Sequence, residues 1–150
     1  MSINKQLPFP EVFFFNNKEF NISDPRRIIN GVAGDFGPSL KIKQIKLIHF
    51  SKKSLKDREI TGNHKHYSDS GQWEIIIVFG ESVNPQFDFR YRNYNDPVSK
   101  KKLFSGDVVL VPPGCSLGLI PLELGALVIE ISNCEYNSKN YIKDDLFNEK

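Results

Sequence analysis

The sequence predicts an all-β fold, either a sandwich or a barrel. Short apolar segments recur along the chain at intervals of about 8–12 residues, and glycines, prolines and asparagines fall between them. The composition agrees, because twelve phenylalanines stand against one methionine, as is typical of a rigid, aromatic-rich β core. At 150 residues the chain is long enough to bury such a core within one domain.

The first part of the chain is expected to be an N-terminal arm, residues 1–25, followed by a single domain over residues 26–150. The arm begins with polar residues and two prolines and continues into the aromatic run 12–15. Such a run predicts a short strand that another element, for example a second subunit, has to cover. A second strand is expected over 26–32, where glycines end it.

The middle of the chain alternates between strands and turns. The segment 73–79 is apolar on both faces, as expected where a core covers one face and a second sheet or subunit covers the other. The segment 86–92 alternates cleanly between aromatic and polar side chains. Further strands are expected over 40–50, 61–66, 107–111 and 126–131, with polar loops over 51–59 and 93–102.

The last part of the chain changes its period. Tyr141, Asp145 and their apolar neighbours are at helical spacing, with Ser138 or Asn137 as a possible cap. The sequence therefore predicts a short C-terminal helix over residues 138–147.

Charge and composition argue against several classes of protein. The formal net charge is +2 and the lysines are scattered apart from the run 100–102, so no basic stripe predicts nucleic-acid binding. No segment approaches the ~18 apolar residues of a membrane span, and prolines interrupt any signal peptide. Cys115 and Cys134 are too few for a disulfide framework or a zinc site, so we expect a cytoplasmic protein.

Two of the three histidines, His64 and His66, lie two residues apart just before the longest apolar run. On a strand their side chains project to the same face. A pair of imidazoles there can hold a metal ion or transfer protons near neutral pH. A tightly packed apolar core would leave both rings without hydrogen-bond partners, which favours a functional role over a structural one.

The residues around this pair resemble the first sequence signature of the cupins, which are small jelly-roll barrels. The signature is matched in order by Gly62, His64, His66, Glu74 and Gly80. The resemblance implies an all-β, cupin-type double-stranded β-helix, to which the short C-terminal helix would be added.

The second cupin signature is matched except at its histidine. Gly106, Pro112 and Gly114 stand at the expected spacing, but Leu117 occupies the histidine position. Metal-binding cupins use that histidine as a ligand, so the resemblance favours a barrel that uses no metal or other cofactor.

Among metal-free cupins the chain resembles enzymes that act on nucleotide-linked sugars. These are the dTDP-4-keto-sugar 3,5-epimerases and, more closely, the dTDP-4-keto-6-deoxyhexose 3,4-ketoisomerases. The ketoisomerases have a Gly-x-His-x-His strand, a Pro-Pro-Gly turn and a last strand followed by Asp-Tyr-Ile-Arg-Asp. The corresponding segments here are 62–66, 112–114, 126–132 and 140–144.

The chain also departs from the ketoisomerases at two positions. They have an arginine before the Gly-x-His-x-His motif, where it can meet a phosphate, and this chain has Thr61. Arg58, in the preceding loop, is the candidate to replace it. The ketoisomerases also have a tyrosine on the preceding strand, and its position falls near His49 of this chain.

The resemblance implies a cofactor-free isomerase or epimerase in surface polysaccharide biosynthesis, with a nucleotide sugar as its partner. His66, the second histidine of the motif, would remove the C3 proton that a 4-keto group acidifies, and His64 would return a proton. Two alternatives stay open. One is a non-catalytic cupin that binds a sugar or nucleotide sugar; the other is a metal-dependent cupin with a divalent transition metal on His64, His66 and Glu74.

Five residues are candidates for binding the substrate. Arg90 lies on a polar strand face and could meet a diphosphate bidentately. Glu130 lies within an apolar strand, where an unpaired carboxylate is costly to bury. It either faces solvent or an interface, or lies inside the barrel beside a histidine. We favour solvent or an interface. The five candidates are His49, Arg58, Glu74, Arg90 and Glu130. We also expect a homodimer, because the segment 73–79 is apolar on both faces and the aromatic arm needs cover.

Overall fold

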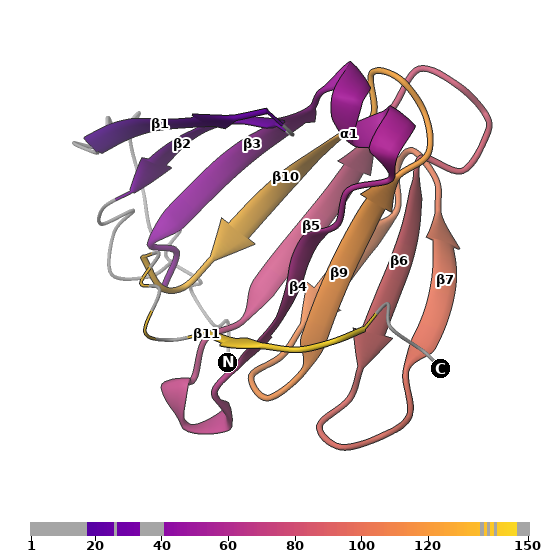
Figure 1. Cartoon of the computed structure of the whole chain (residues 1–150). Helices are drawn as coiled ribbons and strands as arrows, with labels where there is room; N and C mark the ends of the chain where they lie inside the picture. The colour runs from indigo at the N-terminus through magenta and orange to yellow at the C-terminus, as the bar shows by residue number, and fades with distance from the viewer. Residues whose placement is uncertain are drawn as a thin grey trace, which may run out of the picture.

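The computed structural model describes residues 18–25, 27–33, 41–135, 137, 139 and 141–146, which form two antiparallel β-sheets facing each other (Figure 1). The six-stranded sheet has the order β1 (Lys18–Asp24), β2 (Arg27–Ala33), β3 (Gln44–Phe50), β10 (Leu127–Ser132), β5 (Glu74–Phe79), β8 (Val108–Val111). The five-stranded sheet has the order β11 (Tyr141–Lys143), β4 (Thr61–His66), β9 (Ser116–Pro121), β6 (Phe87–Arg92), β7 (Ser99–Leu103). The prediction of an all-β jelly roll is confirmed.

The hydrophobic core lies between the two sheets. Phe87 of β6 is fully buried, and its ring meets that of Phe50 of β3 edge to face, with 5.1 Å between centroids. Alternation along the strands produces this core, since Ile76 and Val78 of β5 and Ile48 of β3 are buried, while the residues between them are more exposed.

The inner face of the six-stranded sheet changes from apolar to polar along its strands. The register aligns Val78, Val128 and Ile48 in one row across β5, β10 and β3. The next row is Ile76, Glu130 and Lys46, and the last is Glu74, Ser132 and Gln44. One end of the barrel interior is therefore lined by polar and charged side chains.

One helix was not predicted. The helix α1 (Lys52–Asp57) forms where we expected a loop, and the side chain of Ser51 caps it by accepting a hydrogen bond from the Ser54 amide at 3.0 Å. A single 3₁₀ turn, η1 (Ser68–Ser70), joins β4 to β5. No helix in the described part of the chain is long and apolar enough to cross a membrane.

The predicted C-terminal helix is wrong within the described residues. Tyr141–Lys143 is a strand, β11, whose register pairs Tyr141 with His66 and Lys143 with His64. The free edge of β4 accepts these residues, so tertiary pairing outweighs a helical pattern only a few residues long.

The strand predicted over residues 12–15 lies outside the described residues. Residues 18–24 of the predicted arm form β1, which pairs with β2, and the division into an arm and a domain stays a prediction. The strands β7 and β9 were not predicted. β7 carries three consecutive lysines and lies at a sheet edge, while β9 contains a glycine and ends in a proline.

Candidate functional site

The strand β4 presents both histidines to the barrel interior across a local irregularity. The register with β9 shifts between Gly62 and His64, and both Gly62 and Asn63 have left-handed backbone angles, with φ of 85° and 59°. A Cβ on Gly62 would lie 3.0 Å from the Leu117 carbonyl oxygen, so only glycine fits there without displacement.

Asn63, in the same irregularity, holds the C-terminal segment 141–146 against the barrel. Its carbonyl accepts a hydrogen bond from the Asp144 amide at 3.0 Å, and its side-chain oxygen accepts one from the Leu146 amide at 3.0 Å. Leu146 is fully buried. These contacts hold β11 along the edge of the five-stranded sheet, beside β4 (Figure 1), which places Tyr141 next to the histidines.

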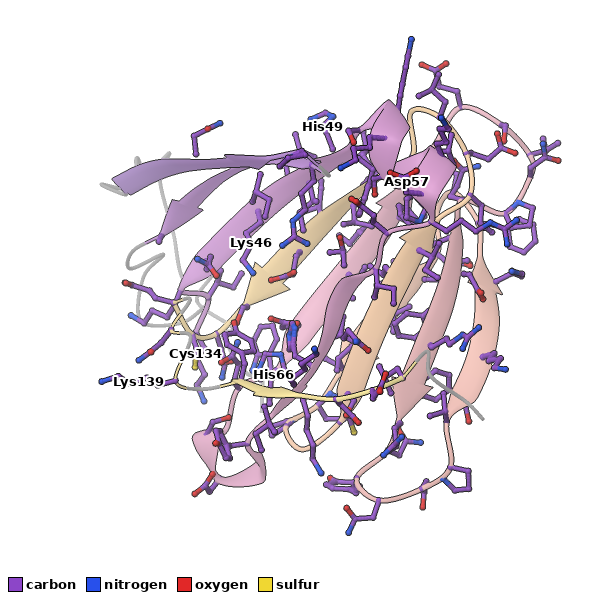
Figure 2. The ribbon with its side chains drawn as sticks, in the orientation of Figure 1. Lys46, His49, Asp57, His66, Cys134 and Lys139 are labelled. Carbon is purple, nitrogen blue, oxygen red and sulfur yellow. The ribbon has the colours of Figure 1, made fainter. Side chains whose placement is uncertain are left out.

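Three rings form the centre of the site. The centroids of His64 and His66 are 5.1 Å apart, and the Tyr141 ring lies 4.5 Å from His64 and 4.8 Å from His66. All three pairs meet edge to face. His66, whose position is labelled in Figure 2, is fully buried. From the sequence, Tyr141 was expected in a helix and without a role in the site.

A buried carboxyl group touches this ring cluster. Glu74 Oε2 lies 3.2 Å from His66 Nε2, while Gln72 Nε2 approaches Glu74 Oε1 at 3.5 Å and donates to the Tyr141 hydroxyl at 3.2 Å. Burial, reinforced by Glu130, raises the pKa of Glu74, and the contact with His66 opposes that rise. Glu74 and Gln72 are both almost completely buried.

A lysine–glutamate ion pair lies on the inner face of the opposite sheet. Lys46 of β3 and Glu130 of β10 face each other across neighbouring strands and are joined by a short contact between Lys46 Nζ and Glu130 Oε1. Burial alone would lower the pKa of Lys46, but the carboxylates of Glu130 and Glu74 outweigh it and raise that pKa to about 12. Glu130 therefore faces the barrel interior, where it meets a lysine, and not the solvent that we favoured.

His64 is neutral at pH 7. Burial, with help from the neighbouring His66, lowers the pKa of His64 to about 4. His64 Nε2 and both ring nitrogens of His66 are buried and have no hydrogen-bond partner among the described residues. Orphaned buried nitrogens are uncommon, so this pair is expected to bind a ligand or water.

The lowered pKa of His64 predicts a loss of stability in acid. Between about pH 6.5 and pH 4 the unfolded chain binds a proton at this position and the folded chain does not. The free energy of unfolding therefore decreases as the pH is lowered through this window. Below that window both states are protonated and the effect stops. A His64→Gln variant, measured by urea unfolding from pH 7 to pH 4, should lose less stability than wild type, by up to about 3 kcal/mol. Parallel pH dependences would contradict the assignment.

A cavity of about 380 Å³ opens beside His64. Its lining residues are Ile60, Gly62, Asn63, His64, Tyr141 and Lys143. The cavity therefore gives a ligand access to one histidine of the pair, next to an exposed lysine.

The ligand atoms of His64, His66 and Glu74 lie within 4.8 Å of one another, so these three residues fit a single metal ion. Leu117, which pairs with His64 in the register of β4 and β9, is buried and offers no fourth ligand.

Three of the predicted site residues lie away from the ring cluster. His49 is exposed and leaves β3 on the side opposite to Lys46 (Figure 2). Arg90 lies on the outer face of the five-stranded sheet, where it donates to the Leu146 carbonyl at 3.3 Å. Arg58 is exposed at the end of α1, two residues before the cavity residue Ile60.

Neither a protein-family model nor a curated protein matches the sequence. Among solved structures, the capsular polysaccharide assembling protein CapF from Staphylococcus aureus is 17% identical, with a TM-score of 0.63 over 87% of this chain. The chain spans only 33% of CapF's length.

Two solved ketoisomerases match over most of their own length. WlaRA, a TDP-fucose-3,4-ketoisomerase from Campylobacter jejuni, is 19% identical, with a TM-score of 0.53 over 87% of this chain and 90% of WlaRA. A mutant of the 3,4-ketoisomerase QdtA from Thermoanaerobacterium thermosaccharolyticum, in complex with TDP-4-keto-6-deoxyglucose, is 17% identical, with a TM-score of 0.54 over 85% of both chains. The fold is therefore that of the cupins, and 3,4-ketoisomerases are among the structures it resembles.

Proposed function

We propose that the chain isomerises or epimerises a nucleotide-linked keto-deoxysugar by histidine-mediated proton transfer, without a cofactor, in surface polysaccharide biosynthesis. The observation that carries the proposal is the pair of buried imidazoles with unused nitrogens, one of them against a buried carboxyl group. Similar folds in a TDP-fucose-3,4-ketoisomerase and in a capsular polysaccharide assembling protein support the substrate class and the pathway.

In this proposal His66 is the base. Glu74 Oε2 lies 3.2 Å from His66 Nε2, so we assign the ring N–H to Nε2, facing the carboxyl group, and the lone pair to Nδ1. A 4-keto group acidifies the C3 hydrogen of the sugar, and His66 removes it to give an enediolate. The carboxylate orients the ring and stabilises the imidazolium that forms.

His64 returns the proton at C4, or to the opposite face of C3 or C5 in an epimerase. Because the pKa of His64 is about 4, a proton that reaches this ring is readily released. Tyr141 packs against both rings and keeps water from the intermediate. Arg58 and Lys143, near and at the edge of the cavity, are the candidates to bind the diphosphate.

Thermal-shift screening against dTDP-, UDP-, GDP- and CMP-sugars tests the ligand class. At about 100 times its Kd, a ligand stabilises the folded state by about 2.7 kcal/mol, which raises the Tm of a chain of this size by roughly 5–10 °C. We expect a shift of this size with a dTDP-sugar and a smaller one in an Arg58→Ala, Lys143→Ala variant. If no nucleotide sugar moves the Tm, the proposed ligand class is wrong.

The alternative is a cupin that binds a sugar or nucleotide sugar without turnover. Thr61 favours this alternative, because the ketoisomerases have an arginine at the position that this buried threonine occupies. A metal-dependent cupin is a second alternative, since His64, His66 and Glu74 fit one ion, which would supply a Lewis acid. Stoichiometric metal that is lost in a His64→Ala variant would support it.

We further propose that the protein is a cytoplasmic homodimer. Both cysteines are free, as expected in a reducing compartment. The outer face of the six-stranded sheet is apolar in successive rows across four strands. A second copy of the same sheet is the occupant that suits such a face, because most homo-oligomers pair identical surfaces.

A further inference from the structure

The Lys46–Glu130 pair is a buried ion pair next to the hydrophobic core, and stability alone does not account for it. The next inner-face residues along the two strands, Ile48 and Val128, belong to the hydrophobic core. Replacing a buried ion pair by well-packed apolar residues is often neutral or stabilising, so a pair retained at this position needs another explanation.

Lys46 has donors to spare. An ammonium group carries three N–H donors, and the carboxylate of Glu130 is the one acceptor that Lys46 Nζ meets among the described residues. The residue as a whole is only 9% exposed, and no other lysine or arginine in the described part of the chain is as deeply buried.

Lys46 and the ring cluster share one interior. The charge of Lys46 acts on His64, Glu74 and Tyr141, and that of Glu130 acts on the same three residues. Lys46 projects from the inner side of β3, the side that faces His66 across the barrel (Figure 2).

The proposed reaction creates a need for this cation. When the C3–H bond breaks, its electron pair forms the C3–C4 double bond, and the C4 carbonyl π electrons move onto oxygen. The resulting oxyanion would lie near two carboxylates, Glu74 and Glu130, which would repel it. A preorganised donor or cation that meets the developing charge lowers the barrier most.

We propose that Lys46 is a catalytic residue that donates a hydrogen bond to the keto oxygen and stabilises the enediolate, while Glu130 positions its ammonium group. The inference rests on the proposed function and adds the electrophilic group to it. Protons balance as follows: His66 takes the C3 proton and passes it to the neutral His64, which returns it at C4, while the O3 hydroxyl proton moves to O4 and Lys46 keeps its own.

The test is solvent exchange of the C3 hydrogen in a dTDP-4-keto-6-deoxysugar. A Lys46→Met variant should exchange about 10²–10³-fold more slowly than wild type, the usual cost of losing an oxyanion donor. Its binding of dTDP alone, which lacks the 4-keto sugar, should be unchanged. Lys101→Met, on the exposed strand β7, is the matched control and should exchange at the wild-type rate.

A second variant separates catalysis from stability, because Lys46→Met leaves Glu130 buried without its partner. The double variant Lys46→Met, Glu130→Leu replaces the pair by apolar side chains and should melt at or above the wild-type temperature, yet exchange as slowly as Lys46→Met. A double variant that exchanges at the wild-type rate would overturn the role of Lys46 but leave the proposed function standing. Wild-type protein that shows no exchange would instead overturn the proposed function, and this inference with it.

Discussion

Replacing His66 by alanine is expected to slow exchange of the sugar's C3 hydrogen with deuterated solvent by ~10²–10⁴-fold, the usual loss when one general base is removed. His66 is the histidine in contact with Glu74, and its Nδ1 is free to accept a proton. Proton NMR of a dTDP-4-keto-6-deoxysugar in deuterated buffer measures the exchange. Binding of dTDP should be almost unchanged, because the diphosphate candidates lie outside the ring cluster.

The matched variant is His64→Ala, which should slow product formation but keep part of the C3 exchange, since proton removal can proceed without correct return. Thermal unfolding of both variants checks that the barrel is intact. Equal loss of exchange in the two variants would contradict the division of roles. If wild-type protein binds the keto sugar but does not exchange its C3 hydrogen, the function is binding of a sugar or nucleotide sugar without turnover.

The fold could be predicted from the sequence because local patterns and global architecture agree. Alternation in 86–92 and the apolar run in 73–79 correspond to β6 and β5, and the turns between strands carry their own glycine and proline signals. The pattern was weakest where tertiary pairing decided the structure. Tyr141–Lys143 is a strand only because the free edge of β4 lies beside it.

The candidate site was predictable only in its local part. His64 and His66 are two residues apart, so their shared face follows from strand geometry alone. Lys46 and Glu130 are separated by 84 positions and meet because β3 and β10 are neighbours in the sheet. A lysine in an alternating strand is ordinarily solvent-exposed, and no sequence signal distinguished this one.

The outer face of the six-stranded sheet carries the last prediction, which concerns assembly. The register aligns Leu47, Ile129, Ile77 and Val108 in one row across β3, β10, β5 and β8. A parallel row consists of Ile45, Ile131, Ile75 and Leu110. Val108 and Leu110 are 64% and 62% exposed in the single chain. Contiguous apolar patches of this kind mark interaction sites in soluble proteins.

We expect wild-type protein to sediment as a dimer at micromolar concentration and an Ile77→Lys variant to sediment as a monomer. Ile77 lies inside its row, between Ile129 and Val108, so a lysine there would bring an unpaired charge into the centre of the interface. Loss of a central contact worth ~2 kcal/mol or more weakens a dimer by at least roughly 30-fold. Val83→Lys is the control, because Val83 is 94% exposed in the loop between β5 and β6 and should leave the dimer intact. A wild-type monomer at these concentrations would contradict the prediction and show that another part of the same chain covers the apolar rows.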